Sequence, residues 1–268
     1  MQTWHDQDAR RDSRTRWLDG APAQGDTERQ RSKAGRGGNG LNRFVLPLLS
    51  TLALAATPAP VSAQASGHDA QLWINTTLFG SVGDVAFFAE VQPRFGNGIS
   101  QLDQLILRPA VGWKVTKDLT LYQGYAYVED HGTGPVLVEN RSFQEVNWKI
   151  GEYNGLKTSS RTRFEQRWRS DGKDVAFRAR QQFRVAAPLF EGADSVSLVG
   201  WSETFIALND ADWGPKAGFD QLRTFAGLEV PIGGKSTVEV GYINRLIKSS
   251  GSGLQTDHIV SLNLSIRP

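Results

Sequence analysis

The stretch Arg161-Thr-Arg-Phe-Glu-Gln-Arg-Trp-Arg169 alternates strictly between charged and uncharged residues. A repeat of two residues is typical of a β-strand, because successive side chains point to opposite faces of a sheet. The next run, Val175–Val185, repeats the pattern with arginines and glutamine on one face and mainly apolar side chains on the other. Ser170–Asp174 lies between the two runs, contains Asp-Gly and predicts a tight hairpin.

Similar runs of about ten residues, separated by turn residues, continue along the chain. No stretch after Ala63 shows a helical stripe, so the sequence predicts an all-β protein. Eleven segments are strand candidates: 71–79, 85–95, 105–113, 119–128, 142–150, 158–169, 175–187, 195–208, 221–232, 237–247 and 258–266.

So many antiparallel strands fit either a sandwich or a closed barrel. In a soluble protein the apolar faces would form the core, whereas in an outer-membrane barrel they would face lipid and the polar faces would line the interior. Strand length and the alternation of short turns with longer polar loops favour the second alternative. We therefore expect a closed antiparallel up-and-down transmembrane β-barrel of ten to twelve strands. A soluble periplasmic β-protein is the alternative.

The N-terminal part of the chain has a different character. Residues 1–42 are polar and basic without periodicity, which indicates a disordered leader, and a misassigned start site would also explain them. Residues 43–63 follow, with Arg43, an apolar run and the small-residue exit Val61-Ser-Ala63. This order is typical of a signal peptide, and the run is too short for a spanning helix. We expect cleavage near Ala63 and a barrel over residues 64–268 in the cell outer membrane.

Composition excludes several classes of function. The chain has no cysteine, which excludes disulfides, thiolate metal sites and cysteine nucleophiles. The formal net charge is +2, and removal of residues 1–63 would leave 21 Lys/Arg against 22 Asp/Glu, so nothing indicates nucleic-acid binding. The expected partners are outer-membrane lipid and, during biogenesis, the barrel-assembly machinery and periplasmic chaperones.

Loop lengths predict an orientation. The connections at 129–141, 170–174, 209–218 and 248–257 are expected to be extracellular, and those at 116–118, 151–155, 188–194 and 233–235 periplasmic. Residues 85–266 then give ten strands with both ends periplasmic. Segment 71–79 is left over, and it could join the barrel edge, lie in the lumen or pair with a further strand.

Several short pieces of the chain resemble the bacterial outer-membrane β-barrel family catalogued as domain of unknown function 2490. They are Trp73, Arg108-Pro-Ala-Val-Gly-Trp113, Gly124-Tyr125, the arginines of 161–169, Arg184 with Pro188, Phe219–Gly227 and Glu239-Val-Gly-Tyr242. The resemblance covers most of residues 73–264 and implies a membrane barrel. The family carries no established reaction, so the resemblance implies no catalytic residue. The chain ends on Ile266-Arg-Pro268, whereas such barrels usually end on an aromatic residue.

Nothing in the sequence predicts catalysis, a metal site or a cofactor. An outer-membrane lipid-modifying hydrolase, the alternative function, would need a serine within reach of a histidine base. The exported chain has only His68, His131 and His258, and no His-x-Ser pair. Asp210 and Asp212 are the nearest approach to a calcium site, and two acids in a polar loop are usually only solvated.

The unusual feature is a set of charges on the predicted inner face. The central members are Arg161, Arg163, Glu165, Arg167, Arg169, Arg178, Arg180, Arg184, Glu203, Arg223 and Glu239, and the remaining members are Glu90, Arg108, Glu145, Lys149, Glu229 and Arg245. Ion pairs among them could fill a narrow barrel. The excess of cations would also suit a narrow anion-favouring channel or binding barrel. Glu165 is expected to be shared with Arg178, Arg180 and Arg184 on the neighbouring strand.

Overall fold

The computed structural model describes residues 68–132, 134–192, 195–248 and 253–268. The chain divides into two units, Met1–Val61 and Ser62–Pro268, and every described residue belongs to the second. The predicted leader over 1–42 and the signal peptide over 43–63 lie outside the described residues. The described part of the chain contains no helix long and apolar enough to cross a membrane.

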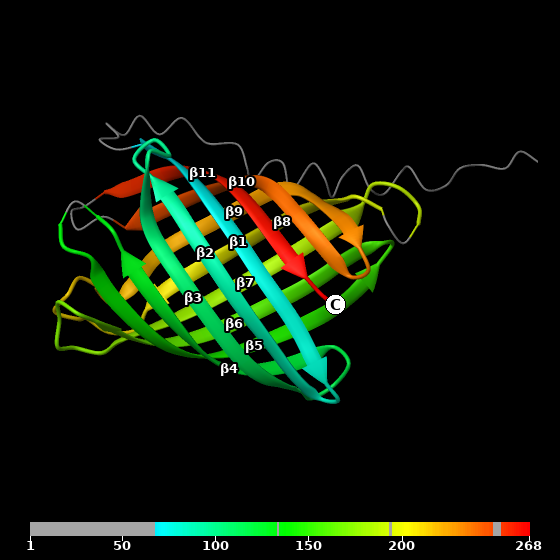
Figure 1. Ribbon diagram of the computed structural model, residues 1–268, viewed down its shortest axis with the longest axis horizontal. Helices are drawn as coiled ribbons and strands as arrows, with labels where there is room; N and C mark the ends of the chain where they lie inside the picture. Colours follow the sequence, from blue (N-terminus) through cyan, green and yellow to red (C-terminus); the bar gives the residue numbers. More distant parts are fainter. Residues whose placement is uncertain (1–67, 133, 193–194, 249–252) are drawn as a thin grey trace, which may run out of the picture. The chain divides into compact units, whose positions relative to one another are not determined.

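Eleven strands form one closed barrel in which neighbours along the chain are neighbours in space (Figure 1). Every predicted strand is present, and most extend beyond the predicted bounds. The strands are β1 His68–Val82, β2 Val85–Gly96, β3 Gln101–Lys114, β4 Leu119–Asp130, β5 Leu137–Tyr153, β6 Leu156–Arg169, β7 Ala176–Pro188, β8 Ser197–Ala207, β9 Gly218–Gly233, β10 Ser236–Lys248 and β11 Leu254–Ile266.

The barrel closes through a parallel seam. Ten consecutive hairpins reverse the chain ten times, so β1 and β11 run in the same direction and can pair only in parallel. Trp73 is aligned with Ser261 and Leu78 with Ile266. The number of strands lies within the expected range of ten to twelve, whereas the expectation of an entirely antiparallel barrel is wrong at this seam. The left-over segment 71–79 belongs to β1, which lies between β2 and β11 (Figure 1).

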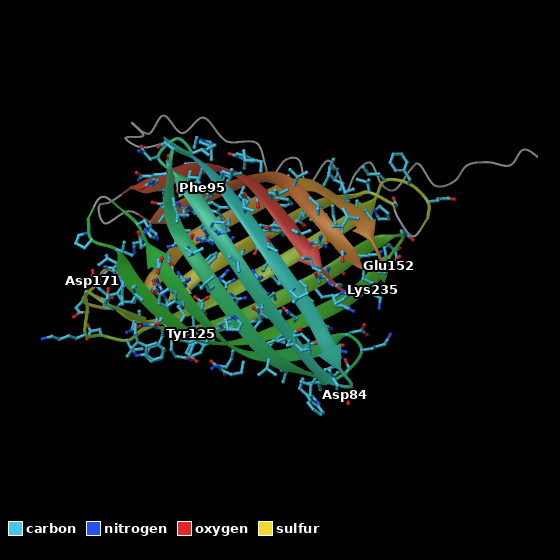
Figure 2. All side chains as sticks on the ribbon, in the orientation of Figure 1. Asp84, Phe95, Tyr125, Glu152, Asp171 and Lys235 are labelled. Atoms are coloured by element: carbon cyan, nitrogen blue, oxygen red, sulfur yellow. The ribbon has the colours of Figure 1, made fainter. Side chains whose placement is uncertain are left out.

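The two ends of the barrel differ. We call the end with the connections β2/β3, β4/β5, β6/β7, β8/β9 and β10/β11 the loop end, and the opposite end the turn end. Asp171 lies at the loop end, and Asp84, Glu152 and Lys235 lie at the turn end (Figure 2). β1 starts at the loop end and β11 finishes at the turn end, so the two ends of the strand system lie on opposite sides. The expected arrangement with both ends on one side applies to β2–β11 alone.

The β4/β5 loop is shorter than predicted, because β5 begins at Leu137 rather than at Ser142. Asn154-Gly155, both at positive φ, form the two-residue turn between β5 and β6 at the turn end. β11 begins at Leu254, four residues before the predicted start.

The distribution of polar and apolar side chains between the two faces of the sheet is the reverse of that in a water-soluble β-protein. The outer face carries exposed large apolar side chains throughout the described strands, including Trp113, Tyr125, Trp168, Phe177 and Phe183. Figure 2 shows side chains on both faces of the strands. The inner face buries apolar residues in separate small clusters and, between them, a large set of arginines and glutamates. The candidate site is this charged interior.

Candidate functional site

β5, β6 and β7 supply the centre of the charged interior. Their two-residue period turns every second side chain inward, and the register sets charged residues side by side across the strands. Glu145 is aligned with Arg163, and Glu165 with Arg178. Of the predicted set, Arg163, Glu165, Arg167, Arg178, Arg180, Glu203 and Arg223 are buried, together with Arg108 and Glu145.

Glu165 is the hub of the network and is only 1% exposed. One carboxylate oxygen lies 2.6 Å from Arg178 Nη2 and the other lies 2.9 Å from Arg180 Nη1. Arg163 Nη1 approaches to 3.8 Å. Both oxygens of this buried carboxylate thus accept charge-assisted hydrogen bonds, which is the condition under which such a group is tolerated away from water.

Arg180 carries the network onward to the next strand. Its Nη2 lies 2.8 Å from Glu203 Oε1, and Arg161 Nη2 donates to the same oxygen at 2.8 Å. Arg163 pairs with Glu145, and Arg108 pairs with Glu90. The Arg108–Glu90 pair lies apart from the other charges, which form one connected network: Glu145, Arg163, Glu165, Arg178, Arg180, Glu203 and Arg161.

Arg184 does not share Glu165, which corrects that part of the prediction. It lies nearer the turn end, where its Nη2 is 2.7 Å from Glu229 and 3.1 Å from Glu239. Both partners are on strands other than the direct neighbours of β7. Arg169, at the loop end of β6, pairs instead with Asp171 at 2.6 Å.

Four buried charged residues of the interior are absent from the predicted set: Arg94, Glu139, Arg141 and Asp257. Asp257 fell in the predicted loop 248–257, yet it belongs to β11 and pairs with Arg245. Glu139 and Arg141 fell in a segment read as a loop, yet they belong to β5, where Glu139 accepts from Arg141 at 2.8 Å and also from Arg167. Arg94 lies on the inner face of β2. The alternation Glu139-Asn-Arg141-Ser-Phe143 was a detectable strand signal.

The interior holds two cavities of about 410 and about 490 Å³, the first toward the loop end and the second toward the turn end. Four residues line both cavities and so separate them: Arg94, Arg108, Arg180 and Arg223. We call these four arginines the partition. Eleven Lys or Arg but only three Asp or Glu line the loop-end cavity, so its surface is strongly electropositive.

Two loops contact each other at the loop end of the barrel. The β8/β9 loop, residues 208–217, and the β6/β7 hairpin, residues 170–175, bind each other, and we call this contact the loop clasp. The Asp212 carboxylate accepts the backbone N–H groups of Lys173 at 2.9 Å and Asp174 at 3.2 Å, and the Asp174 carboxylate accepts the N–H of Asp212 at 3.0 Å. Trp213 is buried beneath this contact.

Trp213 connects the loop clasp to the interior. Its indole nitrogen donates to the Asp174 carbonyl at 2.9 Å. The guanidinium carbons of Arg167 and Arg169 lie 4.9 and 4.8 Å from the centre of its rings, within cation–π range. The side chain therefore reaches inward from the loop, and it lines the loop-end cavity.

We expect Asp212→Ala to open the loop clasp and to speed tryptic cleavage after Lys173 and Lys216 several-fold, with the barrel intact. The two donated amides hold the pKa of Asp212 below its ordinary value. A lowered pKa means that the charged form stabilises the clasp above about pH 4 and that this contribution is lost as pH falls further. Limited proteolysis at pH 7 measures the effect. Glu191→Ala, on the exposed β7/β8 turn, is the control, and equal cleavage rates in both variants would contradict the role of Asp212.

The residues considered for catalysis and metal binding lie apart from the network. His131 Nε2 is 3.1 Å from Glu129, and His258 Nδ1 is 2.5 Å from the Tyr242 hydroxyl. His68 is the first described residue, and only its backbone is described. Asp210 and Asp212 use their carboxylates on backbone N–H groups. Within the described ranges, no group of three or more His, Cys, Asp or Glu could hold a metal ion.

Comparison with known proteins identifies the family of the chain but assigns no activity to it. The family model described as "Protein of unknown function (DUF2490)" matches residues 70–255, which span β1 to the start of β11. An uncharacterized protein of Methylorubrum extorquens is 66% identical over 221 residues, which is 82% of this chain and 96% of that protein. No solved structure matches the chain. By sequence and by the extent of the match, the chain belongs to the DUF2490 family of proteins of unknown function.

Proposed function

We propose that the protein is a non-catalytic integral β-barrel of the bacterial outer membrane, with an interior largely filled by ion pairs. The observation that carries the proposal is the inverted polarity. Phe183 is 57% exposed and Trp113 is 54% exposed on the outer face, whereas Glu165 is 1% exposed inside. Burial of apolar surface is worth about 25 cal/mol per Å², so an apolar outer face favours lipid over water as its surroundings.

Two further features support a membrane location. The strands have 11 to 17 residues, and a tilted strand needs about 9–11 to span the bilayer core. The barrel is closed, so every strand is paired on both sides, as a bilayer requires. The expected signal peptide would deliver the chain to the periplasm, where chaperones and the assembly machinery would take it to outer-membrane lipid.

Longer loops are characteristic of the outer side of such barrels, so we propose that the loop end faces the medium and the turn end the periplasm. The loop clasp would then lie outside. Because the strand number is odd, the start of β1 would also be on the outside.

A narrow channel for small anions is the second candidate for the interior. The electropositive loop-end cavity favours it, because cations lining a low-dielectric space attract anions. The partition divides the two cavities, so only small ions would pass. Planar bilayer recordings would separate the two candidates, since a filled barrel gives no steps and a narrow channel gives small anion-favouring steps.

We expect the protein to remain in the membrane pellet after carbonate washing and to migrate faster on gels before heating than after it. The chain has no cysteine, so single cysteines report on each face. Phe177→Cys and Phe183→Cys should react at least tenfold more slowly with a membrane-impermeant maleimide than Lys173→Cys in the exposed hairpin.

Denatured samples of all three cysteine variants give the reference labelling. Release by carbonate together with rapid labelling at positions 177 and 183 would refute the membrane location and support a soluble periplasmic protein.

A further inference from the structure

Within the described residues, two arginines of the partition have no carboxylate partner. Arg94 and Arg223 are each 8% exposed. Arg94 donates to the side-chain oxygens of Gln104 at 2.8 Å and Gln92 at 2.9 Å, and Arg223 Nε donates to Gln221 at 3.0 Å. Among the described residues, neither forms an ion pair, although Glu203 is aligned with Arg223 across β8 and β9. The Glu203 carboxylate is bonded to Arg161 and Arg180 instead.

Trp73 brings the two unpaired arginines together. The guanidinium carbon of Arg94 lies 3.8 Å, and that of Arg223 4.8 Å, from the centre of the Trp73 ring. Arg223 also lies over the Phe205 ring, at 4.5 Å. Ring contacts of this kind orient a guanidinium but leave its N–H groups free, because the ring faces the plane of the cation.

Free donors remain on both groups. In the described structure neither terminal nitrogen of Arg223 donates a hydrogen bond, and Arg94 Nε is buried without a partner. A guanidinium has five N–H donors in a planar fork that fits an oxyanion, and a buried cation without a counter-ion is costly. The other two members of the partition, Arg108 and Arg180, have partners in Glu90, Glu165 and Glu203.

We propose that the partition binds a small oxyanion, held by Arg223 and Arg94 between the two cavities, with Trp73 on the side of the turn-end cavity. The class comprises phosphate, sulfate and small carboxylates, because their oxygens accept from the open fork of Arg223. The site is inside the barrel between two cavities of a few hundred cubic ångströms, which excludes lipids with long acyl chains. Such an anion would supply the counter-charge that the chain itself does not supply at this point.

Calorimetric titration of the folded, detergent-solubilised barrel with inorganic phosphate at pH 7 tests the proposal, at constant ionic strength set with chloride. We expect one saturable site and competition by sulfate. Arg223→Gln should weaken phosphate binding at least tenfold, and Arg223→Lys, which keeps the charge but loses the fork, should lie between. Arg94→Gln serves as a second variant if Arg223→Gln does not fold.

Lys149→Gln is the matched control, because it removes one positive charge from the turn-end cavity away from the partition. Its affinity for phosphate should equal that of the unaltered chain. An absence of saturable binding, or equal affinities in Arg223→Gln and Lys149→Gln, would overturn the proposal. The titration uses the folded barrel in detergent, so a negative result leaves the carbonate and labelling tests of the membrane location unaffected.

Discussion

Glu165→Gln is expected to lower sharply the temperature at which the barrel loses its compact, fast-migrating form on gels. The substitution keeps the shape of the side chain but removes the charge that Arg178 and Arg180 share. Removing one partner of a buried ion pair costs about 3–5 kcal/mol, because the remaining charges stay away from water without compensation. Two arginines lose their shared partner at once here, although Arg180 keeps Glu203 and Arg178 keeps Asp220 at 3.3 Å.

Glu152→Gln is the control for this measurement. Glu152 is exposed at the turn end of β5 (Figure 2), so the same chemical change there should alter stability by less than about 0.5 kcal/mol. Equal transition temperatures in the two variants would contradict the role of Glu165 as a hub. If Glu165→Gln also raised anion conductance in planar bilayers, Glu165 would line an open channel, and the filled interior would have to be abandoned.

The face of each residue was predictable from the sequence because it depends only on local alternation. Arg163, Glu165 and Arg167 share a face for any straight strand, and the hairpin at 170–175 places Arg178 and Arg180 beside them. The choice of ion-pair partners was predictable only where the partners are adjacent in register. Arg184 pairs with Glu229 and Glu239 because the sheet curves into a barrel. The alternation of polar and apolar residues along a strand does not reveal this curvature.

The parallel seam through which the barrel closes was not predictable for a similar reason. Segment 71–79 has the same two-residue alternation as the other strands. Its local sequence does not indicate that it pairs with the last strand, or that this pairing is parallel. The partition depends on the same long-range order, because Arg94 and Arg223 come from strands far apart in sequence and meet at Trp73. The composition did not reveal it either, because the nearly equal numbers of positive and negative residues over 64–268 conceal an excess of arginine at one level of the interior.

Gly124→Val is expected to destabilise the barrel by about 3 kcal/mol, at the upper end for overpacked sites. Gly124 lies on β4 directly opposite Phe143 on β5, and the phenyl ring covers the glycine. A Cβ at position 124 would lie 2.6 Å from the Cε1 and Cε2 atoms of Phe143, closer than real Cβ atoms approach any atom. Glycine in a strand often marks such a close approach.

The Phe143 ring cannot simply move aside. It is 1% exposed, stacks on Phe88 at 6.4 Å between centroids, and lies 4.4 Å below the guanidinium carbon of Arg163. Displacing the ring would therefore also displace Arg163 from its pair with Glu145. The thermal transition of the compact form measures the loss, and Gly134→Val, in the β4/β5 loop with open space around it, is the control.

A double variant tests whether the ring is the cause. Phe143→Ala alone should cost about 3–5 kcal/mol through the cavity it leaves. Combined with Gly124→Val, it should cost clearly less than the two losses together, because the valine then occupies space that the ring has vacated. Strictly additive losses would show that the ring is not what makes glycine necessary at position 124. They would also remove the structural link between this strand pair and the Arg163–Glu145 pair of the charged interior.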